Sequence, residues 1–202
     1  MKRLLSLITL LLAFTAGWAD SPLTSTHFAE AYSDHPMVQM ACEEMQGEIP
    51  TTLLNFLANK NEPVDVRLAV INKLGWNFDG TSMGAQLGEY LMGRYKAKNE
   101  SKLVKKLDAG TLAVYAYAKA MSNYFDVKDA SELGHKAVKK NKKKSFSVAM
   151  ASALIDAQVY LDSDWSMVYK VVADVLHDGS LHLDMRQEAI DNIMEYINLY
   201  NE

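Results

Sequence analysis

Proline is confined to the first third of this 202-residue chain, and that distribution constrains the fold more than any other feature. The prolines are Pro22, Pro36, Pro50 and Pro63. Because proline breaks helix interiors and is excluded from most central strands, the sequence beyond Pro63 holds none of the usual helix interruptions. The sequence contains no Asn-Gly or Gly-Gly dipeptide, which would indicate a hairpin turn, and no alternating strand pattern bounded by turn residues. The chain is therefore predicted to be all-α.

Apolar residues recur at helical spacing along most of the chain, and residues that suit helix N-caps precede several of these runs. The expected caps are Asp108, Ser145, either Ser163 or Asp164, and Asp184. We expect about eight to ten helices, over residues 26–46 with a bend at Pro36, 51–59, 64–74, 82–95, 109–120, 129–139, 146–159, 165–176 and 185–199.

Three glycines fall inside the helix expected over 82–95: Gly84, Gly88 and Gly93. A glycine in a helix interior costs about 1 kcal/mol relative to alanine. Their presence indicates either a close approach to another helix or a loosened segment.

The stretch 61–75 is the clearest single helix, and part of its pattern recurs near the end of the chain. It carries Asp65, Arg67, Ala69, Val70, Leu74 and Gly75, and the partial echo over 184–193 carries Asp184, Arg186, Ala189 and Ile190. This pattern resembles the signature of HEAT-like helical repeats. The resemblance implies an α-solenoid of stacked helix pairs.

Four alanines, at positions 69, 113, 149 and 189, are separated by 44, 36 and 40 residues. These separations fall around the period of about 40 to 47 residues that paired-helix solenoid repeats have. The two middle units lack the arginine, so an irregular multi-helix bundle remains the alternative. The environment of Arg67 distinguishes the solenoid from the bundle. An ion pair between Arg67 and an acidic residue of a neighbouring helix would favour the solenoid, and exposure of Arg67 to water would favour the bundle.

Residues 1–19 read as a secretory signal peptide. Lys2 and Arg3 precede an apolar run over 4–14, and Gly17-Trp18-Ala19 forms a small-x-small cleavage site. Cleavage would leave a single all-helical domain over 20–202 with 19 basic and 25 acidic residues, a net charge of −6, and no membrane span. Its only cysteine, Cys42, cannot form an internal disulfide. We therefore expect a soluble periplasmic or secreted protein of bacterial type.

Composition favours a protein partner over a nucleic acid. Nucleic-acid binding calls for a clearly basic surface, which an acidic chain without aromatic residues among its lysines does not provide. A lysine run over 136–144 could contact an acidic partner, and tyrosine and tryptophan are frequent at interfaces. The predicted partner-binding residues are Trp76, Lys140, Lys143 and Trp165.

The alternative is a metal-binding or hydrolytic protein centred on His177 and His182. With Asp178 they form the densest polar cluster, and imidazole and carboxylate are ligands that zinc accepts. The spacing matches no zinc signature, and a solvated turn at Gly179 is the simpler interpretation. No catalytic residue and no cofactor is predicted, which favours a non-enzymatic protein without deciding the matter. The leading expectation is an exported protein-binding module, of which an immunity or inhibitor protein is one concrete form.

Overall fold

The computed structural model describes residues 21–41, 47–75, 82–142 and 144–201, and within these ranges the chain is all-α, as predicted. The described residues form ten α-helices and two short 3-10 helices, and their only β-type contact is an isolated bridge between Ser145 and His182. In chain order the elements are η2 (Phe28–Tyr32), α2 (Pro36–Met40), α3 (Thr51–Leu57), α4 (Val64–Leu74), α5 (Met83–Arg94), α6 (Glu100–Lys106), α7 (Ala109–Ser122), α8 (Lys128–Lys140), α9 (Phe146–Leu161), α10 (Trp165–Leu176), α11 (Gln187–Ile197) and η3 (Asn198–Tyr200).

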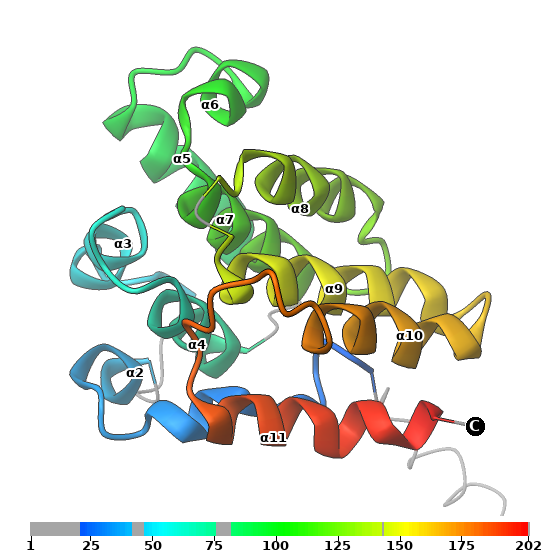
Figure 1. The fold of residues 1–202 in the computed structure, drawn as a ribbon. Coiled ribbons are helices and arrows are strands. Elements are labelled where there is room, and N and C mark those ends of the chain that lie inside the picture. Colours follow the sequence, from blue (N-terminus) through cyan, green and yellow to red (C-terminus); the bar gives the residue numbers. More distant parts are fainter. Residues whose placement is uncertain (1–20, 42–46, 76–81, 143, 202) are drawn as a thin grey trace, which may run out of the picture.

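Helices α7 and α9 form the centre of the core (Figure 1). Helix α7 packs against α4, α5, α8 and α9, and α9 packs in turn against α8 and α10. Both central helices are buried along most of their length and are rich in alanine. Small side chains allow several neighbours to approach one helix at once, because they add little bulk to the contact.

The glycines of α5 mark a close approach to α7. A Cβ placed on Gly84 would lie 2.8 Å from the Cα of Lys119, and one on Gly88 would lie 2.9 Å from the hydroxyl oxygen of Tyr115. The amide of Gly84 also donates to Ser122 Oγ at 2.8 Å. Gly93 has no neighbour within 4 Å of such a Cβ. The expected close approach is thus confirmed at two of the three glycines.

The two ends of the described chain meet. Element η2 packs between α4 and α11, and Figure 1 shows the N-terminal segment running alongside the C-terminal helix. The hydroxyl of Tyr32 donates to Asp65 Oδ2 at 2.9 Å and accepts from the amide of Arg186 at 3.0 Å. The Arg186 guanidinium also donates to Asp34 and lies over the Tyr32 ring, 4.7 Å from its centroid.

This closure departs from an open solenoid, in which each unit contacts only its neighbours. Arg67 gives neither of the two outcomes expected of it, because it is fully buried and no carboxylate of the described residues lies within 4.0 Å of its nitrogens. Instead its Nη1 donates to Thr111 Oγ1 at 3.1 Å, and that hydroxyl donates to Asp108 at 2.7 Å. What the fold supports is an all-helical packing of about ten helices.

Three local predictions were wrong. The helix expected over 26–46 is, up to residue 41, a 3-10 turn followed by the short α2, because Pro36 starts a new helix and holds His35 in an extended conformation. Helix α6, capped by Asn99, was not predicted. Asp184 does not cap the last helix, which begins after Arg186; its carboxylate accepts from the amide and hydroxyl of Ser147 in α9.

The signal-peptide prediction for 1–19 falls outside the described residues. Within the described ranges, no helix has both the length and the apolar character needed to cross a membrane.

Candidate functional site

Helix α10 covers the core with one face and presents Trp165 on another. Its buried side chains are Val168, Val172 and Ala173, which pack toward α9. Trp165 and Tyr169 are four residues apart and so share a face of the helix. Trp165 remains 67% exposed, which is unusual for so large an apolar side chain.

The end of the described chain extends this aromatic surface. Leu199 in η3 is 71% exposed, and the Tyr200 ring lies edge-on to Trp165 with centroids 5.9 Å apart. The hydroxyls of Tyr196 and Tyr200 are hydrogen-bonded at 2.8 Å. Trp165, Tyr169, Leu199 and Tyr200 line a pocket of 290 Å³, and we call these four residues the aromatic patch.

Exposed acids flank the aromatic patch. Asp162 and Asp164 lie in the turn just before Trp165, and both are exposed. Asp164 precedes α10 without accepting from its backbone amides, and its carboxylate accepts instead from the Ser166 hydroxyl at 2.7 Å. The patch thus combines an apolar surface with a negatively charged edge.

A second pocket, of 570 Å³, lies where α4, α7, α8 and α9 come together, and we call it the basic pocket. Four cationic side chains and two carboxylates line it: Lys60, Arg67, Lys140, Lys142, Asp108 and Asp184. Asp108 accepts hydrogen bonds from Thr111 in the first turn of α7, and Asp184 accepts from Ser147 in the first turn of α9. These donors are neutral, so both carboxylates keep their charge, and four cations against two carboxylates leave the pocket with a net positive charge.

Lys140 has a structural task in this pocket. Its ammonium donates to the carbonyl oxygens of Val104 at 2.7 Å and Leu107 at 2.6 Å, at the end of α6. A cation at the C-terminal end of a helix is electrostatically favourable. The predicted partner-binding residue Lys140 is thus a fixed charge that joins α8 to α6. Of the other three, Trp165 lies in the aromatic patch, and Trp76 and Lys143 lie outside the described residues.

Of the three candidate metal ligands, only His182 lines the basic pocket. Its backbone joins the loop to the start of α9, because its amide donates to Lys144 O at 2.7 Å and its carbonyl accepts from the Phe146 amide at 2.9 Å. His177 ends α10. Asp178 accepts from the Ser180 amide at 2.9 Å. Among the described residues, no group of three or more histidine, cysteine, aspartate or glutamate side chains is placed to hold a metal ion.

The hydrogen bonds from Ser180 keep the pKa of the Asp178 carboxyl below its usual value. Such bonds within one turn are what an ordinary polar turn requires, so the loop over 177–182 shows turn-forming contacts rather than ligand geometry.

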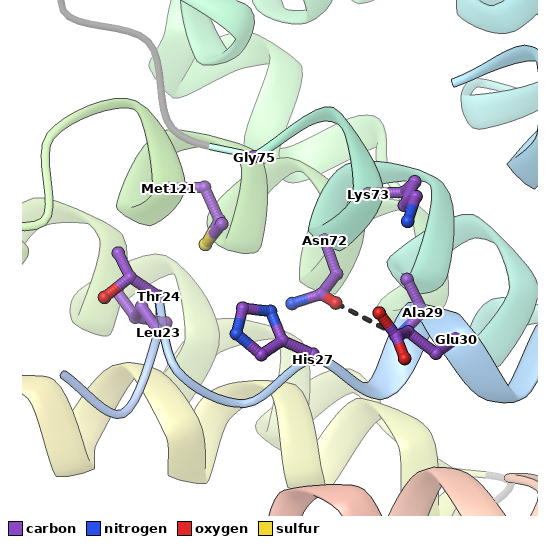
Figure 2. A pocket seen from close by; sticks show the side chains of 9 residues that line it. All are labelled: Leu23, Thr24, His27, Ala29, Glu30, Asn72, Lys73, Gly75 and Met121. Atoms are coloured by element: carbon purple, nitrogen blue, oxygen red, sulfur yellow. Dashed lines mark hydrogen bonds between the residues drawn. The ribbon is translucent and has the colours of Figure 1, made fainter. Parts of the chain in front are cut away.

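Figure 2 shows a smaller pocket of 240 Å³, with the His27 ring near Asn72 and Met121 across from it. The Asn72 side chain accepts from the Ala29 amide at 3.0 Å and donates to Thr26 O and to Tyr117 Oη. Its hydrogen-bonding groups are therefore used to fix the N-terminal segment on α4 and α7, and this pocket is a packing feature.

Several site residues were not among the predicted partner-binding residues: Tyr169, Leu199 and Tyr200 of the aromatic patch, and Lys60 and Arg67 of the basic pocket. The sequence does indicate that Arg67 is buried, because at helical spacing it lies on the same face of the helix as the apolar residues Val70, Ile71 and Leu74. An arginine on that face has to be buried. For Leu199 no local signal distinguishes exposure from burial.

Burial lowers the pKa of the Arg67 guanidinium, and the nearby Asp108 partly opposes this effect. Arginine nevertheless remains protonated in proteins, so Arg67 is a buried positive charge.

Comparison of the chain with protein-family models, curated proteins and solved structures finds no match.

Proposed function

We propose that this protein is an exported protein-binding module whose contact surface is the aromatic patch. The observation that carries the proposal is the exposure of Trp165 beside Leu199 and Tyr200 around one pocket. Tryptophan and tyrosine supply much of the binding energy at protein interfaces, because they bury a large area at low conformational cost.

The charge around the aromatic patch indicates the kind of partner. Asp162 and Asp164 border it, and the chain as a whole has a net charge of −4. A partner that places an apolar side chain in the 290 Å³ pocket and basic side chains around it would match both features. An immunity or inhibitor protein is a specific form of this proposal, since it acts by covering a partner's surface. Export itself rests on residues 1–19 and stays a prediction.

The test begins with a photo-crosslinking residue at position 165 in the cells that produce the protein, and mass spectrometry of the adduct. The affinity of the purified partner is then measured for the unmodified chain and for Trp165→Ala. Loss of a central tryptophan at an interface should weaken binding by about 30-fold, which corresponds to about 2 kcal/mol.

Phe125→Ala is the matched control, because Phe125 is an aromatic residue of similar exposure, 69%, between α7 and α8. If Trp165→Ala binds the identified partner as tightly as Phe125→Ala does, the aromatic patch is not the contact surface. If nothing is cross-linked to position 165 under any condition of growth, the proposal fails as well.

A further inference from the structure

Leu199 lines two neighbouring pockets. One is the pocket of the aromatic patch. The other has a volume of 440 Å³ and is also lined by His27 and Glu30 of the N-terminal segment and by Asn192 and Glu195 of α11, and we call it the acidic pocket. A single side chain that is 71% exposed is therefore the shared boundary of the two pockets.

Two carboxylates determine the charge of the acidic pocket. Glu30 and Glu195 are both exposed, and neither forms an ion pair within the described ranges of the chain. The described residues that line this pocket include no lysine and no arginine, and His27 is the one lining side chain that can carry a positive charge. The acidic pocket is thus open to a cation from a partner.

The aromatic patch and the acidic pocket form one continuous surface. Asn192, Glu195 and Leu199 are three and four residues apart, which is the spacing of neighbours on one face of a helix. Tyr196 lines the acidic pocket and Tyr200 lines the aromatic patch, and their hydroxyls are hydrogen-bonded at 2.8 Å. This bond joins the walls of the two pockets and fixes their relative position.

Carboxylates therefore lie on both sides of the aromatic patch. Asp162 and Asp164 precede Trp165 on the α10 side, whereas the acidic pocket adjoins Leu199 on the η3 side. An apolar pocket between two acidic borders matches an apolar side chain between two basic ones. The same charges disfavour a symmetric dimer through this face, which would bring like charges together, and they disfavour nucleic acid.

We propose that the aromatic patch and the acidic pocket together bind an extended segment of the partner protein with the residue order basic–x–apolar–x–basic. Alternate side chains of an extended chain point to the same side about 7 Å apart, so three of them can reach three adjoining sites. The apolar side chain enters the 290 Å³ pocket, one basic side chain meets Glu30 and Glu195, and the other meets Asp162 and Asp164. This inference rests on the proposed function and adds the chemistry of the segment that the partner inserts.

Fluorescence anisotropy of a synthetic peptide added to the purified protein tests the proposal. The probe is Gly-Arg-Ser-Phe-Ser-Arg-Gly with an uncharged fluorophore and blocked ends. It should bind saturably, and its affinity should fall as sodium chloride is added. Replacing both of its arginines by glutamate, or its phenylalanine by serine, should each weaken binding by about tenfold or more.

Matched glutamate variants of the protein separate a built site from diffuse attraction. The double variant Glu30→Gln, Glu195→Gln should weaken binding of the probe by about fivefold or more. The control is Glu89→Gln, Glu132→Gln, which removes the same charge from exposed positions on α5 and α8 and should change binding by less than about twofold.

The proposal is overturned if the probe does not bind saturably, or if the two glutamate pairs weaken binding equally, which would show a general charge effect. It is also overturned if the partner cross-linked to position 165 binds Glu30→Gln, Glu195→Gln as tightly as the unmodified chain. In each of these cases, weaker binding of that partner to Trp165→Ala would still support the aromatic patch as the contact surface. Failure of this inference is thereby distinguished from failure of the proposed function.

Discussion

Gly84 lies where α5 approaches α7 closely, and replacing it with alanine tests this contact. The replacement combines a steric clash with a gain in helix propensity, and a control in the same helix separates the two. In Gly84→Ala the new methyl group would lie 2.8 Å from the Cα of Lys119 and 3.1 Å from its backbone nitrogen. Because both atoms are backbone, a side-chain rotation cannot relieve the clash, and α5 must move. That movement also strains the hydrogen bond from the Gly84 amide to Ser122 Oγ.

The size of the effect follows from two opposing contributions. Overpacking a well-filled contact costs about 1–3 kcal/mol, and exchanging glycine for alanine in a helix returns up to about 1 kcal/mol. With the full return from alanine, Gly84→Ala should lower the free energy of unfolding by up to about 2 kcal/mol. Gly93→Ala is the control in the same helix, since its Cβ would meet nothing within 4 Å. It should raise the free energy of unfolding by up to about 1 kcal/mol.

Urea unfolding monitored by far-UV circular dichroism measures both variants, with the slope of the transition checked for constancy. At this chain length, a change of 1 kcal/mol corresponds to about 2–4 °C in the unfolding temperature. The reasoning is refuted if Gly84→Ala is as stable as Gly93→Ala. That result would show that α5 is not held against α7 at the observed distance.

Two further predictions concern single carboxylates. Burial raises the pKa of Glu100, but hydrogen bonds from Lys119 and Tyr115 lower it further, to below 4.5, so the stability that Glu100 contributes is present above pH 4.5 and is lost as the pH falls through the lowered pKa. The difference in the free energy of unfolding between wild type and Glu100→Gln should therefore become smaller on acidification. A difference that stays constant between pH 7 and pH 3 in urea unfolding would contradict this. Asp184→Ala should destabilise the protein by about 1–2 kcal/mol, because it removes the acceptor of the Ser147 amide in the first turn of α9, which the N-cap Ser145 does not satisfy. Asp164→Ala, which removes no bond to a backbone amide of α10, should have a smaller effect, and equal losses of the two variants in urea unfolding would argue against this role of Asp184.

Helices defined by local signals could be predicted from the sequence. Asp108 and Ser145 accept from the amides of Thr111 and Val148, as their cap assignments require, and residue types alone carry that information. Helix α6 was missed because its seven residues bury only Leu103, so its apolar periodicity is weak. Short helices of this kind depend on tertiary contacts, here the ammonium of Lys140 on the carbonyls at the end of α6.

The candidate sites were less predictable, because exposure and burial are set by neighbours distant in the sequence. Trp165 was identified by residue type, but its surface is completed by Leu199 and Tyr200 in η3, which follows the next helix along the chain. The basic pocket is lined by residues as far apart in the sequence as Lys60 and Asp184, from four helices and the adjoining loops. No local sequence pattern indicates that these residues lie together. Asp184 shows the same difficulty: its position before a helix suggested a cap, and the fold uses it on a different helix.

The two Asp-x-Arg stretches illustrate how a pattern can mark real contacts without marking a repeat. In stacked repeats, equivalent residues would make equivalent contacts in successive units. Here Asp65 and Arg186 bind the same hydroxyl group, that of Tyr32, one accepting from it and the other donating to it through its amide. Arg67 and Asp184 serve different helices, α7 and α9. Asp65 and Arg186 thus both hold Tyr32 of η2, which packs between α4 and α11. The start of α4 and the loop before α11 meet the starts of α7 and α9 at the basic pocket, where Arg67 contacts α7 and Asp184 contacts α9, so the two stretches share one site without occupying equivalent positions in it.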